Sequence, residues 1–230
     1  MRSVPWWVLF SSVCAPILLV GGWSVAAELQ GPGYDPESTT ISILAADGAA
    51  GYWVMTSALL ALGVCHMVTA CGLRLAAPFG RVALAGGGVS SMLLALFPAP
   101  PSGGSFAHGA VVVVGFALLA MWPVLAVRRG ASTVRVPGAS TVRLPTERAT
   151  ASVRRAAASL GRAMPWGLRP VPSAGASVVM WLAGAWFLLA LLAFGSAGAA
   201  ERVTTFAQSF WPLVVVVSCA RWTGEDGQPT

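Results

Sequence analysis

Six long apolar stretches dominate the sequence and limit what this chain can fold into more than any other feature. They lie at about residues 5–27, 52–73, 82–98, 107–127, 176–198 and 204–220. Each is close to the roughly 20 residues with which an α-helix crosses a ~30 Å hydrocarbon layer. Lipid offers no partner for free backbone N–H and C=O groups, so we expect these spans to be helices. Strands of a membrane barrel would alternate polar and apolar side chains, and these stretches do not.

Composition agrees with a membrane protein. Of the 230 residues, 56% are hydrophobic and 10% are charged, whereas a soluble domain carries about 25% charged residues. The net charge of +6 sits almost wholly in one loop rather than on a folded basic face, which argues against a nucleic-acid partner. The four cysteines fall inside apolar segments and predict no disulfide framework. We therefore expect an all-α polytopic membrane protein, a six-transmembrane-helix bundle forming a single domain over residues 1–230, without a cofactor.

The arginines predict the orientation of the bundle. One precedes the first span (Arg2), two lie in the second connection (Arg74 and Arg81), nine lie between Arg128 and Arg169, and one follows the last span (Arg221). If the N-terminus is cytoplasmic, all of these are cytoplasmic and only Arg202 lies outside. Because basic residues accumulate on the cytoplasmic side of membrane proteins, we expect both termini inside and a place in the cytoplasmic membrane.

The first span has an alternative interpretation. Ala26-Ala27 before Glu28, after a lone basic residue and an apolar run, resembles a signal peptide with its cleavage site. The run is longer than the usual 7–15 residues, which favours a retained span. Cleavage would leave five spans and an external N-terminus.

The segment 128–175 differs in composition from the spans. It contains a tandem octapeptide over residues 131–138 and 139–146, with proline in each copy. Proline and sparse apolar content predict a flexible basic cytoplasmic loop. Residues 150–164 carry one apolar helical face, so they form either an interfacial helix on anionic headgroups or a solvated loop.

The first outer loop, between Glu28 and Tyr52, is the most polar connection outside the basic loop. Its Asp35-Pro36 step is typical of a turn. The polar run 38–40 can cap a short helix over residues 41–46, which would lie on the bundle like a lid. The alternative is an ordered connecting loop without a further role.

Candidate catalytic residues gather at this same outer level. His108 begins the fourth span, Glu201 and Arg202 begin the sixth, and Asp35 and Ser42 lie in the outer loop. A carboxylate, an imidazole and a hydroxyl are the parts of a general acid–base site. With two histidines in all and no metal-ligand spacing, we predict no metal. Glu201 can equally be a carboxylate at a helix start, with Arg202 as its interfacial neighbour.

Two further polar residues lie at membrane depth. His66 is past the middle of the second span, where ionisable residues face the bundle interior and are candidates for function. In the sixth span, Pro212 frees a backbone carbonyl near Gln208. We expect His66, Gln208 and Trp211, with Ser42 and Arg202 above them, to line a ligand cleft. The alternative for His66 is a simple hydrogen bond to a carbonyl or to Gln208.

Several short motifs also resemble a known family. They begin at Val4 (Val-Pro-Trp-Trp), Leu19 (Leu-Val-Gly-Gly-Trp), Gly33 (Gly-Tyr-Asp-Pro), Thr40 (Thr-Ile-Ser), Gly63 (Gly-Val-Cys-His), Ala107 (Ala-His-Gly), Ala200 (Ala-Glu-Arg), Ala207 (Ala-Gln) and Trp211 (Trp-Pro). Together they resemble an actinobacterial integral membrane family, domain of unknown function 998 (DUF998), over nearly all of the chain outside the basic loop. The resemblance implies six helices and supplies no activity. It places His66, His108, Asp35, Ser42, Glu201 and Gln208 on motif positions.

Two hypotheses for function follow. The first is a bundle that binds, transports or scaffolds a lipid or hydrophobic small molecule, with membrane lipids as partners. The second is a membrane-embedded enzyme acting on a lipid or prenyl substrate at the outer face, in which His108 with Asp35 or Glu201 moves protons. The enzyme hypothesis gains if His108, Asp35 and Glu201 lie around one pocket, and it loses if they point apart. Coupled transport ranks third, because only His66 and Gln208 lie at mid-membrane depth.

Overall fold

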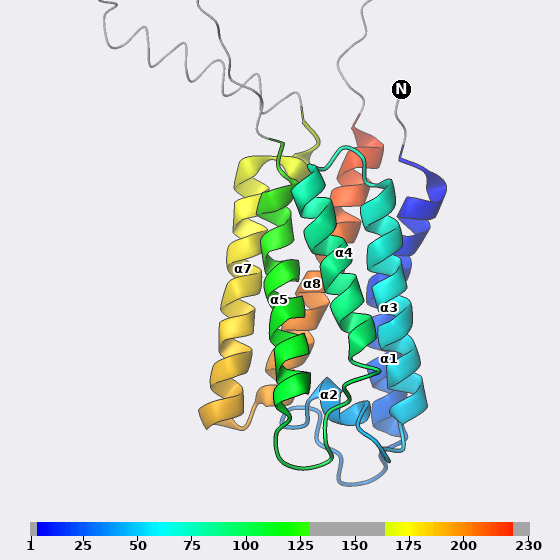
Figure 1. Ribbon diagram of the computed structural model, residues 1–230, viewed down its shortest axis with the longest axis vertical. Helices are drawn as coiled ribbons and strands as arrows, with labels where there is room; N and C mark the ends of the chain where they lie inside the picture. Colours follow the sequence, from blue (N-terminus) through cyan, green and yellow to red (C-terminus); the bar gives the residue numbers. More distant parts are fainter. Residues whose placement is uncertain (1–3, 129–163, 223–230) are drawn as a thin grey trace, which may run out of the picture.

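The computed structural model describes residues 4–128 and 164–222, and all regular structure within these ranges is helical. Six long helices form the body of the molecule: α1 (Trp6–Glu28), α3 (Tyr52–Gly72), α4 (Pro78–Leu93), α5 (Phe106–Ala126), α7 (Pro170–Leu189) and α8 (Ala197–Arg221) (Figure 1). Three short elements join them: α2 (Ile41–Leu44), the 3-10 turn η1 (Trp166–Leu168) and the π-helical turn η2 (Ala190–Phe194). The all-α prediction is confirmed. The tandem octapeptide and nearly all of segment 150–164 lie outside the described residues.

Five of the described helices are long and apolar enough to cross a membrane. They are α1, α3, α5, α7 with its extension to Leu192, and α8. Helix α4 has 16 residues, which is about 24 Å of helix and shorter than a ~30 Å hydrocarbon core. The chain thus has the helices of a multi-pass membrane protein.

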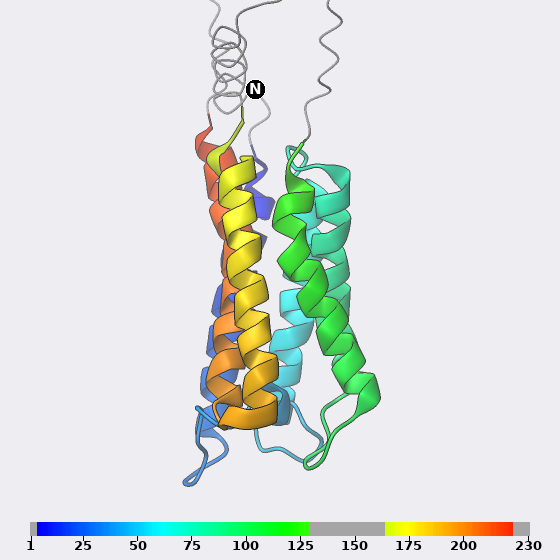
Figure 2. The same ribbon diagram turned by 90° about the vertical axis from the view of Figure 1, so that its left-hand side faces the viewer.

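The six long helices form a closed ring. In chain order each packs on the next, from α1 through α3, α4, α5 and α7 to α8, and α8 packs back on α1 (Figures 1 and 2). Successive helices run in opposite directions, so the start of α1 and the end of α8 lie at one end of the ring. We call this the arginine end, because Arg74, Arg81, Arg128, Arg169 and Arg221 flank its helices. The opposite end, covered by α2, is the lid end.

Three helices begin several residues earlier than the sequence predicted, α4 at Pro78 by four residues and α7 and α8 by more. Helix α7 starts at Pro170, with Pro172 also in its first turn, where a missing N–H breaks no helical hydrogen bond. Residues 164–175, expected within the flexible loop, therefore belong to the folded part. Helix α8 starts at Ala197 because Gly195, with φ of +64°, reverses the chain just before it. Glu201 consequently lies inside α8 rather than before the span.

Two large apolar cores lie inside the ring, and a third, smaller one packs α7 against the start of α8 through Phe187 and Ala200. The arginine-end core includes Leu84, Leu119, Trp122, Val215 and Val216. The lid-end core packs α1, α2 and α3 together through Leu19, Ile41, Leu44, Met55 and Leu62. Helices α3 and α4 touch backbone to backbone, since a Cβ on Gly88 would lie 2.6 Å from the carbonyl oxygen of Gly63. Small residues allow this approach in a bundle that lipid surrounds.

Candidate functional site

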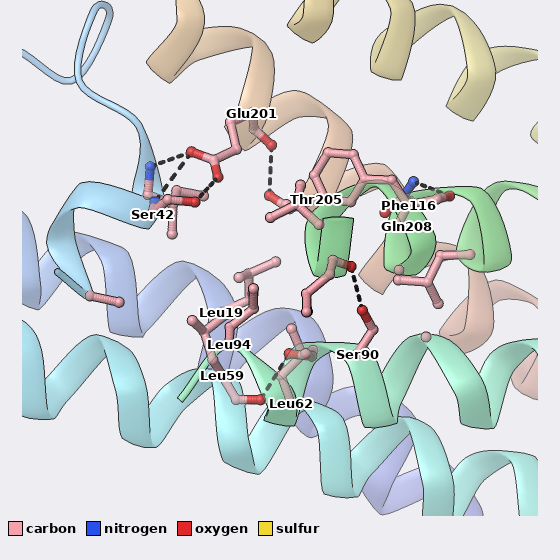
Figure 3. A pocket seen from close by; sticks show the side chains of 18 of the residues that line it. Leu19, Ser42, Leu59, Leu62, Ser90, Leu94, Phe116, Glu201, Thr205 and Gln208 are labelled. Atoms are coloured by element: carbon pink, nitrogen blue, oxygen red, sulfur yellow. Dashed lines mark hydrogen bonds between the residues drawn. The ribbon is translucent and has the colours of Figure 1, made fainter. Parts of the chain in front are cut away.

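A cavity of about 70 Å³ lies inside the ring, toward the lid end (Figure 3). Every long helix except α7 contributes to its wall, and α2 contributes Ile41, Ser42 and Ala45. Most of the lining is apolar. Its polar members are Ser42, His66, Ser90, Ser91, His108, Glu201, Thr205 and Gln208. One water needs roughly 10–15 Å³ of such space, so the cavity has room for several waters or for the end of a slender chain.

Glu201 joins α8 to the lid. Its side chain is 3% exposed, and its Oε2 accepts hydrogen bonds from the backbone N–H groups of Ile41 and Ser42 (3.4 Å for Ser42). Its Oε1 accepts a hydrogen bond from the Ser42 hydroxyl at 2.8 Å (Figure 3). The residue that precedes α2, Thr40, makes no side-chain cap. Glu201 therefore caps α2 from a helix that lies about 160 residues further along the chain.

Ser42 also contacts His108, which connects α5 to the same cluster. The Nε2 of His108 lies 3.2 Å from the Ser42 hydroxyl oxygen, and its Nδ1 lies 2.8 Å from the carbonyl oxygen of Phe97. The ring is thus held at both nitrogens. We refer to Glu201, Ser42 and His108 as the lid cluster.

One proton of the lid cluster can lie on either Glu201 or His108, and every hydrogen bond of the cluster is satisfied in both cases. A carbonyl only accepts, so Nδ1 of His108 carries a hydrogen. If Ser42 donates to an ionised Glu201, Nε2 must also carry a hydrogen and the imidazole is charged. If Glu201 is protonated and donates to Ser42, the Ser42 hydroxyl donates to a neutral imidazole. The two patterns differ by one proton moved across Ser42, so the cluster can transfer a proton between a carboxylate and an imidazole.

Two polar residues lie deeper in the cavity, and part of their hydrogen-bonding capacity is unused. His66 on α3 and Gln208 on α8 are each 1% exposed. The Nε2 of Gln208 donates to the carbonyl oxygen of Phe116 at 3.2 Å (Figure 3). Within the described residues, the Oε1 of Gln208 and both ring nitrogens of His66 have no hydrogen-bond partner. Buried polar atoms are normally paired, so we refer to these two residues as the deep pair and treat them as a candidate binding site.

The remaining polar lining residues are paired within the bundle. The Ser90 hydroxyl donates to the carbonyl oxygen of Val111 at 2.6 Å, and the Ser91 hydroxyl donates to that of Leu59 at 2.9 Å. Thr205 donates to the carbonyl of Glu201 within α8. Sequence reasoning did not select these three residues. Their pairing makes them structural supports of the wall.

Asp35 does not belong to this cavity. Its carboxylate accepts hydrogen bonds within its own turn, from the N–H of Glu37 at 3.0 Å and from the Ser38 hydroxyl at 2.6 Å. The Ser38 hydroxyl, followed by the Glu37 N–H, lowers the pKa of Asp35 below its ordinary value of 3.8. The expected convergence of Asp35 with His108 and Glu201 is corrected accordingly: Asp35 stabilises the outer loop.

Arg202 and Trp211 also lie outside the cavity lining. The guanidinium of Arg202 donates to the carbonyl oxygens of Pro36 (2.7 Å) and Thr39 (2.9 Å) and to the Tyr34 hydroxyl. It thereby fixes the loop before α2 to α8. Trp211 lies toward the arginine end, where its ring centroid is 5.9 Å from that of Trp166. Neither residue is placed to bind a ligand in this cavity.

A groove on the outside of the ring adjoins the cavity. It has a volume of about 540 Å³ and lies at the lid end, between α5 and α7, where the loop before α2, α2 itself and the connection from α4 to α5 complete its walls. Its walls include Val113, Leu188 and Leu191, which are about half exposed. The groove and the cavity share four lining residues, namely Ser42, Ala99, His108 and Val112. Ser42 and His108 of the lid cluster therefore line both hollows, and Glu201 lines only the cavity.

Among the described residues, no group of three or more His, Cys, Asp or Glu side chains could hold a metal ion. A search of curated proteins and a search of solved structures each found no match. The sequence model of one family, "Protein of unknown function (DUF998)", matches residues 12–144. This range takes in about three quarters of α1 and the whole of α2 to α5, and ends before α7 and α8, so Glu201 and Gln208 lie beyond it. Because the match covers more than half of the chain, the protein belongs to the DUF998 family.

Proposed function

We propose that the protein binds a membrane lipid or a lipid-like small molecule, which enters from the outer leaflet through the groove between α5 and α7. The observation that carries this proposal is that groove and cavity share Ser42 and His108. A ligand in the groove therefore needs to pass only these side chains to reach the interior. Pockets with apolar walls and a few polar groups are the usual form of a small-molecule site.

The sizes of the two hollows indicate how such a ligand divides between them. The cavity of about 70 Å³ holds one end of a slender chain and not a whole lipid. The groove of about 540 Å³ holds the remainder. Its half-exposed walls at Val113, Leu188 and Leu191 face away from the ring, where lipid chains would lie in a membrane. Entry from the bilayer avoids passage of an apolar chain through water.

The proposal includes six spans with both termini in the cytoplasm, in the cytoplasmic membrane. Helix α4 supplies the sixth span, since it packs between α3 and α5 and is followed by a further turn at residues 94–97. Arginines at one end of the ring support this orientation. Reporters fused after residues 50, 103 and 150 should report outside, outside and inside. Any other pattern contradicts the topology.

Blocking the groove tests lateral entry. Gly109 lies in α5 and lines the groove, and a Cβ there meets no atom within 4 Å. Gly109→Phe should therefore fold and fill the groove. Gly184 in α7 also has open space around it and lines neither hollow, so Gly184→Phe is the matched control. The probe is a phospholipid with a diazirine on one acyl chain, crosslinked in nanodiscs and mapped by mass spectrometry.

We expect crosslinks to cavity-lining residues in the wild type and in Gly184→Phe, reduced about tenfold or more in Gly109→Phe. Crosslinks confined to the outside of the ring in the wild type would contradict ligand binding in the cavity. Equal cavity labelling in the two phenylalanine variants would contradict entry through the groove.

A second candidate function is an enzyme that acts on a lipid or prenyl substrate at the outer face. The 3.2 Å approach of His108 to Ser42 at the junction of groove and cavity favours it. Here the lid cluster would transfer a proton to or from the substrate. Lipid profiles of the native host expressing wild type, His108→Ala or Glu201→Gln test this candidate. A changed lipid in both variants supports the enzyme, and unchanged profiles contradict it.

A further inference from the structure

The polar groups around the cavity fall into two sets, which differ in whether they still have hydrogen bonds to form. In the lid cluster, the two oxygens of Glu201, the hydroxyl of Ser42 and both nitrogens of His108 are all engaged in hydrogen bonds. The cluster therefore needs no ligand to satisfy it. The deep pair, His66 and Gln208, retains unpaired buried atoms within the described residues. A ligand that gains hydrogen bonds in this cavity gains them from the deep pair.

The unpaired atoms of the deep pair determine which ligand group can form hydrogen bonds with both residues. A neutral imidazole presents one donor and one acceptor, and the free atom of Gln208 is an acceptor. A hydroxyl group has one hydrogen and two lone pairs, so it can accept from His66 and donate to Gln208. An ether or an ester carbonyl can only accept, and it would leave Gln208 unpaired.

The charged side chains of the cavity lining limit the chemical class of the ligand further. The side chains lining the cavity include one carboxylate, Glu201, and no lysine or arginine. Glu201 precedes Gln208 by seven residues in α8, which is about 10 Å along the helix. An ammonium at the deep pair would be buried without a partner of opposite charge, and a carboxylate would gain one only if buried His66 took up a proton; both are unfavourable. The leading end of the ligand should be polar and uncharged.

The walls above the deep pair suit an apolar chain. Leu19, Leu59 and Leu62 line the cavity between Ser42 and Gln208, and Phe116 lies beside Gln208 (Figure 3). A ligand that reached the deep pair would place its chain against these side chains.

We propose that the cavity selects an amphiphile whose leading end is an uncharged hydroxyl group, bound between His66 and Gln208, with an apolar chain behind it. This inference rests on the proposed function and adds the chemical class of the ligand. A long-chain or prenyl alcohol has this chemistry.

Three competitors of one chain length test whether the leading end of the ligand is a hydroxyl group. Decan-1-ol, decyl methyl ether and decanoic acid compete with the diazirine lipid for crosslinking to cavity residues of the full-length protein in nanodiscs. We expect the alcohol to compete at about a tenfold lower concentration than the ether, which corresponds to one hydrogen bond. The acid should be the weakest. Gln208→Leu should make alcohol and ether equal, because it removes the acceptor that only the alcohol uses. His66→Phe removes a donor that both use, so it should weaken both and keep their ratio, while Ser91→Ala, whose hydroxyl already bonds a carbonyl, should leave both unchanged.

The ether serves as an internal control for folding in Gln208→Leu and Ser91→Ala, because its binding should not change in these two variants. Equal competition by alcohol and ether in the wild type would overturn the hydroxyl assignment, and so would a preference for the acid. Either result, with cavity labelling intact, would leave the binding of an apolar chain standing. Absence of cavity labelling in the wild type would instead contradict the proposed function itself.

Discussion

Replacing Glu201 with alanine should release the lid helix α2 from the bundle. The substitution removes the acceptor of three hydrogen bonds, from the N–H groups of Ile41 and Ser42 and from the Ser42 hydroxyl. A buried hydrogen bond contributes about 1 kcal/mol net, and more when one partner is charged. With three bonds lost, local opening of α2 should become easier by about 3 kcal/mol, a factor of about 150 in its equilibrium constant.

Glu201→Gln should behave differently. The amide oxygen still accepts from both N–H groups, the amide nitrogen donates to the Ser42 hydroxyl oxygen, and the Ser42 hydroxyl donates to a neutral His108. Every hydrogen bond of the cluster is kept, so we expect a change below about 1 kcal/mol. The pair of variants thus separates the loss of bonds from the loss of charge.

Hydrogen exchange measured by mass spectrometry on the purified protein tests both statements. Amides of residues 41–46 should exchange about 100-fold faster in Glu201→Ala than in Glu201→Gln or the wild type, while α3 and α5 serve as internal references. Thr205→Val is the matched control, because the Thr205 hydroxyl bonds only carbonyls of its own helix. Unchanged exchange of residues 41–46 in Glu201→Ala would refute the capping role. Fast exchange in Glu201→Gln would refute the proposed hydrogen-bond pattern.

Three further predictions concern the loop before α2. Arg202→Met should make residues 30–40 at least tenfold more sensitive to limited proteolysis, with Arg202→Lys restoring little, because a lysine cannot span the same carbonyls. Gly198→Ala should lower the melting temperature by an amount equivalent to about 1–3 kcal/mol in the free energy of unfolding, since its Cβ would lie 2.3 Å from the Thr39 carbonyl oxygen. Gly109→Ala, in open space, should leave the melting temperature unchanged. The lowered pKa of Asp35 stabilises its turn fully above the ordinary value and loses this effect as pH falls through the folded value. Chemical shifts of the turn should titrate below about pH 4 in the wild type, and a flat profile, or one unchanged in Asp35→Asn, would contradict this.

Position within a span was informative about position along the bundle. A helix advances 1.5 Å per residue, so residues at the same level of neighbouring helices can be matched from the sequence. This reasoning brought Ser42, His108 and Glu201 to the same end, and hydrogen bonds join their side chains in the structure. The short helix expected from Ile41 is also present as α2.

Helix ends were predicted less accurately, for local reasons. The apolar signal of the fifth span begins only after Pro170 and Pro172, although prolines fit a first helical turn. The sixth span looked shorter because Glu201 and Arg202 are charged. In the folded chain both side chains bind polar groups of the outer loop, so they can lie within a helix.

The sequence of this protein determined its class, its helices and the depth of its polar residues, because lipid forces the backbone into helices and because helical rise is constant. Only the tertiary structure decided which way those residues face. Spans that are apolar on all sides carry little information about their inner face, so closure of the ring by α8 against α1 sets it. That packing separated Asp35 and Arg202, which secure the outer loop, from the lid cluster. It also kept His66 and Gln208 in one cavity, as the sequence had predicted, and left Trp211 outside it.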